Sequence, residues 1–191
     1  MSDQLNDAPR IGIAPDSWGV WNAVDPVQPA PEQYLREVAE AGFHWTELGP
    51  FGYLGTDVVQ LRDRLDEHDL ALSAGTVFTG LHRGPAAIEA AWREISEIAS
   101  IVAALGGEHL ITIPELWGRG EPGMVLGARE FSAAEWHHLV AGHDEIGRRL
   151  GAEFGLAQQF HSHAESPIGS YREVVRFLEH TDPAHTNLCL D

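Results

Sequence analysis

The stretch Thr186-Asn187-Leu188-Cys189-Leu190-Asp191 ends the sequence with a short apolar strand whose last residue is a carboxylate. Parallel α/β barrels place catalytic groups and metal ligands at the carboxyl ends of their strands, so this acid is a candidate site residue. The loop that should follow such a strand would begin where the sequence stops. We therefore expect an α/β barrel truncated after its sixth strand.

Outward from this stretch, the chain alternates between segments with a strand-like pattern and segments with helical spacing. The strands are expected at residues 11–18, 43–48, 70–78, 108–116, 154–163 and 188–191. Five helical segments lie between them. Ser132 and Ser170 are each followed three residues later by a glutamate, which predicts two capping boxes. Strict alternation predicts a parallel sheet with helical crossovers, with six strands and five helices.

Two architectures fit this alternation, an open doubly wound sheet and part of a (β/α)8 TIM barrel. An open sheet usually has a glycine-rich phosphate loop after its first strand, but residues 14–19 read Ala-Pro-Asp-Ser-Trp-Gly. A complete barrel typically needs about 250 residues. We therefore expect residues 1–191 to form a single partial TIM-barrel domain, with residues 1–9 as a flexible terminus. Its unpaired edge strands should make the isolated chain oligomerise, aggregate or melt below a complete barrel.

Composition narrows the function classes. The 191 residues carry a net charge of −17 with histidines neutral, which disfavours binding to the phosphate backbone of nucleic acid. No apolar run approaches the ~20 residues of a membrane helix, and residues 1–10 lack the layout of a signal peptide. The single cysteine, Cys189, cannot form an internal disulfide, so we expect a cytoplasmic protein.

Polar side chains gather where the expected strands end, which is the edge at which barrel active sites lie. In chain order the candidates are Asp16, Glu47, His82, Glu115, His161, His163 and Asp191. His161 and His163 are two residues apart, so they share the face of the strand that would point into a barrel. Paired imidazoles can bind one divalent metal or orient one substrate; the alternative is that they face solvent beyond the strand.

Aromatic residues accompany two of these acids. Trp18 and Trp21 flank the loop after Asp16, and residues 49–55, including Tyr53, are rich in glycine and aromatics after Glu47. Such a loop is suited to covering a small polar ligand. An aromatic face beside a carboxylate suits the apolar face of a sugar or cyclitol ring. The alternative for each aromatic is plain packing, and for Glu47 a solvated position at the start of its loop.

At these residues the chain resembles the xylose isomerase-like TIM barrels, a group of sugar phosphate isomerases and epimerases, and within it the inosose dehydratase branch. The matching stretches are residues 11–19, 47–54, 161–164 and 188–191. Members usually continue the last stretch as Asp-Thr-Gly-His. Many also have a glutamate where this chain has Gly169.

The resemblance implies a divalent cation, Mn, Co, Mg or Zn, at the barrel mouth, with His163 and Asp191 as ligands. It implies a small polyhydroxylated ketone as substrate, within carbohydrate or inositol metabolism. We expect Glu47 and His161 to be catalytic, the alternative base being a carboxylate beyond Asp191. The expected substrate-binding residues are Asp16, Trp18, Tyr53, His82 and Glu115.

In this chemistry a carboxylate removes a proton next to a carbonyl. Returning the proton elsewhere gives isomerisation or epimerisation, and expelling a β-hydroxyl gives dehydration. A non-catalytic sugar-binding barrel and an endonuclease acting at abasic DNA sites are the alternatives. The net charge disfavours the endonuclease.

Overall fold

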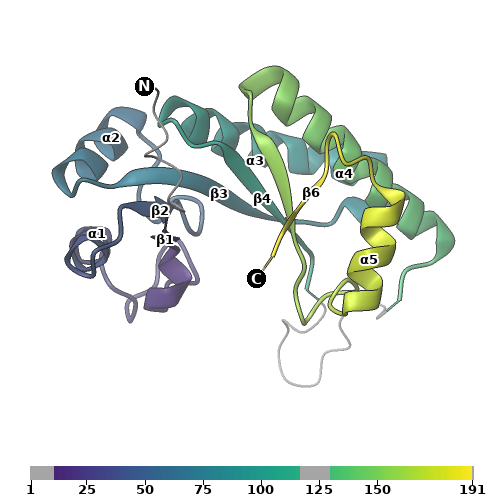
Figure 1. Cartoon of the computed structure of the whole chain (residues 1–191), viewed down its shortest axis with the longest axis horizontal. Coiled ribbons are helices and arrows are strands. Elements are labelled where there is room, and N and C mark those ends of the chain that lie inside the picture. Colours follow the sequence, from purple (N-terminus) through teal and green to yellow (C-terminus); the bar gives the residue numbers. More distant parts are fainter. Residues whose placement is uncertain (1–10, 117–129, 191) are drawn as a thin grey trace, which may run out of the picture.

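The computed structural model describes residues 11–116 and 130–190. Six parallel strands form one curved sheet in the order β1-β2-β3-β4-β5-β6 (Figure 1). The strands are β1 (Gly12–Ile13), β2 (Trp45–Glu47), β3 (Ala71–Thr79), β4 (His109–Pro114), β5 (Ala157–His161) and β6 (Asn187–Cys189). The helices are α1 (Pro31–Glu40), α2 (Val58–Glu67), α3 (Pro85–Ala104), α4 (Ala133–Phe154) and α5 (Tyr171–His180). Two 3-10 helices, η1 (Pro15–Trp18) and η2 (Leu81–Arg83), follow β1 and β3.

The strand order decides between the two architectures. Each strand pairs with its neighbours in sequence, with no point at which the order reverses, whereas a doubly wound sheet has such a reversal. The prediction of six strands and five helices in a partial barrel is therefore confirmed. Both predicted capping boxes are also present, and they fix the starts of α4 at Ser132 and α5 at Ser170. Within the described residues no helix is long and apolar enough to cross a membrane.

The main hydrophobic core lies between the sheet and the helices. Leu72, Leu110 and Phe160 are at most 1% exposed on this side of the sheet, where they pack with the apolar faces of the helices. Gly75 allows α3 to approach closely, because a Cβ at this position would lie 2.5 Å from the Cγ2 of Ile98. We call this the helix side of the sheet, and the opposite, concave face the trough side.

A bulge in β3 interrupts the alternation of side chains between these two sides. Thr46 of β2 pairs with Leu72, but the next residue, Glu47, pairs with Ala74, so Ser73 is an extra residue in β3. Leu72 belongs to the helix-side core, whereas Ala74 packs in a smaller cluster with residues of the trough side. A bulge commonly re-aims side chains near functional sites, and this one changes which residues of β3 face the trough.

The strand boundaries differ from the predicted ones, most clearly in the first, fifth and sixth strands. The first strand was expected over residues 11–18, but β1 covers only Gly12–Ile13, because Pro15 lacks an N–H and starts η1 instead. The fifth strand was expected over residues 154–163, but β5 covers only Ala157–His161. Phe154 ends α4, which Gly155 terminates in the left-handed conformation with φ 71°, and His163 lies beyond the strand. The sixth strand is Asn187–Cys189, and the expectation for Asp191 lies outside the described residues, as does that for residues 1–9.

Candidate active site

The trough side of the sheet lines a cavity of about 1140 Å³. Four of the candidate residues line it: Asp16, Glu47, His161 and His163. They come from separate elements, with Asp16 on η1, Glu47 at the end of β2, His161 at the end of β5 and His163 just beyond. The structure therefore brings together, in one cavity, side chains that are up to 147 positions apart in the sequence (16 to 163).

Glu47 is the most distinctive of these residues. Burial raises the pKa of its carboxyl group, and the nearby charge of Asp16 raises it further. The hydroxyl of Thr76 opposes both by donating a hydrogen bond to Oε2 over 3.1 Å, which favours the ionised form. A carboxylate with a raised pKa is a better proton acceptor near neutral pH than one in free solution.

The position of Asp16 depends on a close contact between two loops. Gly49, just after β2, has φ 65°, and a Cβ there would lie only 2.6 Å from the Cγ of Pro15. Glycine thus supplies both the left-handed backbone and the space that let the loop pack on η1. The adjacent Asp16 then stands at the same cavity as Glu47, with its own Oδ1 accepting from the N–H of Ser17 at 2.8 Å.

His161 and His163 lie side by side, with ring centroids 5.9 Å apart and ring planes inclined by 49°. The Nδ1 of His163 accepts a hydrogen bond from the N–H of Glu165 over 3.3 Å. In the neutral ring this contact places the proton on Nε2, so Nε2 donates rather than offering a lone pair.

This arrangement does not by itself make a metal site. A cation needs the lone pair of an imidazole nitrogen, and in His163 one is occupied by a hydrogen bond and the other carries a proton. Within residues 11–116 and 130–190, no three His, Cys, Asp or Glu side chains converge as metal ligands would. Asp191, the other predicted ligand, lies outside the described residues. Gly169 has no space for a glutamate, because a Cβ there would lie 2.8 Å from the carbonyl oxygen of His163.

His82 and Glu115 also lie close together, but they are not among the residues that line the cavity. The Nε2 of His82 is 4.0 Å from Oε2 of Glu115, and the guanidinium of Arg83 donates to the same carboxylate. The His82 ring packs on Phe131 with centroids 4.7 Å apart. Burial lowers the pKa of His82, and the charge of Glu115 partly offsets this. These residues form a polar cluster at the ends of β3 and β4.

Trp18 and Tyr53 likewise do not line the cavity. The indole N–H of Trp18 donates to Glu37 of α1 over 2.8 Å, and the hydroxyl of Tyr53 donates to the carbonyl of Pro29 over 3.0 Å. Tyr53 is only 4% exposed. Both side chains are thus held by contacts within the chain, Trp18 against α1 and Tyr53 against the loop before it.

Two other aromatic residues line the cavity. Trp21, 57% exposed, and Phe51 line the cavity beside Asp16 and Glu47. The sequence offered Trp21 together with Trp18 as an aromatic residue beside Asp16, and Phe51 as part of the aromatic segment 49–55. Thr76 lines the cavity as well, and its contact with Glu47 could not be inferred because the β3 bulge has no clear sequence signal.

The described geometry agrees with the comparisons to known proteins. Residues 35–191 match the xylose isomerase-like TIM barrel family. An inosose dehydratase from Bacillus anthracis is 26% identical over an alignment of 193 positions, which covers 95% of this chain and 61% of that protein. The chain thus spans about three fifths of the length of this curated relative.

Solved structures show the same fold. A D-allulose 3-epimerase from Methylomonas sp. superposes with a TM-score of 0.69 at 22% identity, covering 94% of this chain and 61% of the epimerase. A xylose isomerase-like TIM barrel protein from Mycobacterium smegmatis, crystallised with magnesium, gives a TM-score of 0.70 at 16% identity, covering 95% of this chain and 64% of that one. At these identities the similarity concerns the fold.

Proposed function

The chain belongs to the xylose isomerase-like TIM barrel family, and we propose that its cavity serves an enzyme that removes a proton next to a carbonyl group. The proposed substrate is a small polyhydroxylated ketone, such as a sugar, a sugar phosphate or a cyclitol. Returning the proton to a neighbouring atom would isomerise or epimerise this substrate. The chain's net charge of −17 continues to disfavour nucleic acid as a substrate.

The observation that carries this proposal is the carboxyl group of Glu47. It lies in the cavity with a raised pKa and is held by a hydrogen bond from Thr76. We assign it the role of the base that accepts the proton. His161, across the same cavity, is the partner that donates a proton to or accepts one from a substrate oxygen. Asp16 would bind substrate hydroxyls, and Trp21 would cover the apolar face of a ring.

Dehydration is the second candidate. The inosose dehydratase of Bacillus anthracis aligns with 95% of this chain, which favours a reaction of that type. Both reactions begin with the same proton transfer from carbon to Glu47. In a dehydration the electron pair left on carbon then forms a double bond as the β-hydroxyl departs, and an acid such as His161 protonates the leaving oxygen to give water.

A divalent cation, Mn, Co, Mg or Zn, remains part of the proposal through the family resemblance, with His163 and Asp191 as its ligands. When bound, such a cation would polarise the substrate carbonyl and make the adjacent proton more acidic. Ligation by His163 would require its ring to give up the hydrogen bond from Glu165. We also propose a cytoplasmic location, on the basis of the single cysteine.

The test is hydrogen exchange in D2O, since it detects proton removal whichever product follows. The purified protein is incubated with candidate ketoses and inososes, and deuterium at the carbon next to the carbonyl is measured by NMR. Glu47→Gln should slow exchange by about 10²–10⁴-fold, the usual contribution of a catalytic base. Glu89→Gln, exposed on α3, is the control and should exchange at the normal rate.

Exchange that persists unchanged in Glu47→Gln would overturn the role of Glu47. The mass of the product separates the two candidates, because dehydration removes one water and isomerisation removes nothing. A parallel sample treated with EDTA tests the cation. Undiminished exchange there would remove the cation from the proposal and leave the role of Glu47 standing.

A further inference from the structure

The bulge in β3 determines which residue stands beside Glu47. If side chains alternated strictly from Leu72, then residue 76 would face the helix side, as Leu72 does. The extra residue, Ser73, reverses this phase, so that Thr76 lines the cavity with Glu47. The hydroxyl of Ser73 donates to the carbonyl of Thr46 over 3.0 Å and holds the two strands together at the irregularity.

We propose that Thr76 is a positioning residue for Glu47: its hydroxyl, 3.1 Å from Oε2, fixes the carboxylate so that Oε1 is the oxygen presented to substrate. The proposal rests on the role of Glu47 as the base. It assigns the bulge a function, because without the phase change at Ser73 the hydroxyl would lie on the other side of the sheet.

The contact should affect both the orientation and the proton affinity of Glu47. A free glutamate side chain samples several rotamers, and a base is effective only when held within reach of the proton it accepts. The hydrogen bond from Thr76 also stabilises the ionised carboxylate, against the opposing influences of burial and the charge of Asp16. Thr76 thereby favours the charged, proton-accepting form of this partly buried carboxylate.

A purely structural role for Thr76 makes a different prediction. Valine has nearly the same shape as threonine but no hydroxyl, so Thr76→Val keeps the packing and removes the hydrogen bond. If Thr76 only filled space, Glu47 would titrate as before in this variant. Thr76→Ser is the conservative partner, because it retains the hydroxyl and loses only a methyl group.

The experiment combines an NMR titration with the exchange assay. Carboxyl carbons are labelled with ¹³C in glutamate, and the Glu47 resonance is assigned by its absence from Glu47→Gln. We expect Thr76→Val to raise the pKa of Glu47 and to slow deuterium exchange roughly tenfold at pH values below that pKa, the loss expected for one charge-assisted hydrogen bond. The acid limb of the pH–rate profile should move to higher pH, and Thr76→Ser should restore both values.

Thr79→Val is the matched control, because it removes a hydroxyl from the same strand that donates to the carbonyl of Ile113 instead. Thr79→Val should leave the pKa measured from the Glu47 resonance unchanged. A Glu47 pKa that is the same in Thr76→Val as in the unmodified protein would overturn the positioning role. If the pKa moves but Glu47→Gln exchanges normally, the positioning stands and the proposed function is wrong, so the two failures are distinct.

Discussion

The two faces of the sheet differ in what they do with their side chains. On the helix side, Phe160 is fully buried, stacked on Phe177 with ring centroids 4.2 Å apart. Polar residues on this side, such as Thr46, are also buried, and Thr46 is bonded to the hydroxyl of Tyr34 over 2.7 Å. On the trough side, Phe78 remains 50% exposed. The helix side therefore provides most of the stability, while the trough side keeps its chemical groups accessible.

The largest expected effect on stability comes from replacing a phenylalanine by alanine, and the same substitution can be made on each face of the sheet. Phe160→Ala should lower the free energy of unfolding by about 3–5 kcal/mol, because it removes a fully buried ring and leaves a cavity. Phe78→Ala removes the same atoms from the trough side, where half of the ring is already in water, and should cost roughly 1 kcal/mol. Urea unfolding followed by circular dichroism measures both. Equal losses in the two variants would show that the trough side contributes as much to stability as the helix side.

The difference between the two faces also explains how much of the fold could be predicted from the sequence. The helix side is built from periodic apolar residues and standard caps, so the alternation, the helices and the capping boxes at Ser132 and Ser170 were predicted correctly. Periodicity is a strong signal where a whole face is buried. The boundaries of β1 and β5 were wrong because Pro15 and Gly155, which end the regular structure there, act locally and without periodicity.

The trough side was harder to predict. Asp16, Glu47, His161 and His163 do line one cavity, as the clustering of polar residues at strand ends suggested. Trp18 and Trp21 could not be distinguished, because Trp18 lies in a 3-10 helix and Trp21 in the loop after it, where the two-residue period of a strand does not apply. Thr76 could not be connected to Glu47, since the extra residue in β3 shifts the register without any proline or charged residue to mark it.

His143 shows what burial on the helix side does to a titratable group. This residue of α4 is 0% exposed, with its ring 5.2 Å from that of Phe160 and its Nδ1 3.0 Å from the side-chain amide nitrogen of Gln158. Its Nε2 has no hydrogen-bond partner among the residues that the structure describes. Burial lowers the pKa of His143 from its ordinary 6.5 to about 3.

This burial predicts an acid-sensitive contribution to stability. Between pH 6.5 and about 3, the unfolded chain binds a proton at His143 and the folded chain does not. The contribution is therefore complete above pH 6.5 and falls as the pH decreases through this window. At about pH 5.5 the loss should be about 1.4 kcal/mol relative to neutral pH.

His143→Gln should remove this part of the pH dependence, as measured by urea unfolding at about pH 7.5 and about pH 5.5. His137→Gln, at an exposed position of the same helix, is the control. We expect the control to lose as much stability on acidification as the unmodified protein, and His143→Gln to lose less. If all three proteins lose the same amount, His143 is protonated in the fold and the helix side is less sealed than its burial indicates.

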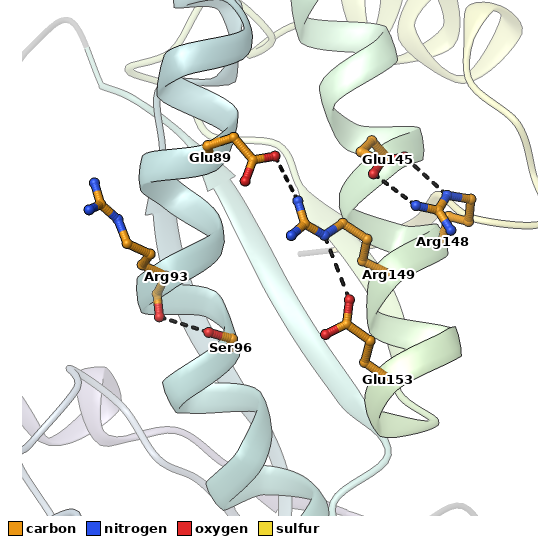
Figure 2. Close-up of polar contacts among 7 residues, drawn as sticks. All are labelled: Glu89, Arg93, Ser96, Glu145, Arg148, Arg149 and Glu153. Atoms are coloured by element: carbon orange, nitrogen blue, oxygen red, sulfur yellow. Dashed lines mark hydrogen bonds and ion pairs between the residues drawn. The ribbon is translucent and has the colours of Figure 1, made fainter.

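Beyond the helix-side core, the outer surface of the helices carries charged side chains, of which two neighbouring arginines differ in their surroundings (Figure 2). Arg149 of α4 lies between two helices: its Nη1 is 2.8 Å from Glu89 of α3, and its Nε is 3.7 Å from Glu153. Its guanidinium also stacks 4.2 Å above the ring of Trp92 on α3. Arg148 instead pairs with Glu145 on its own helix at 2.8 Å. Only 18% of the Arg149 side chain is exposed, compared with 54% for Arg148.

The smallest expected effect follows from this difference. Arg149→Ala should lower the free energy of unfolding by about 1 kcal/mol, because it removes a cation–π contact and the packing of a long stem between α3 and α4. Arg148→Ala should cause no measurable change, since an exposed pair within one helix adds little.

Arg149→Met keeps much of the stem and should recover part of the loss, whereas high salt should not reproduce the loss in the unmodified protein. If salt alone destabilises the protein as much as Arg149→Ala does, the arginine acts through its carboxylates and not through Trp92. If Arg148→Ala and Arg149→Ala lower the free energy of unfolding equally, the helix-side core does not extend outward to Arg149.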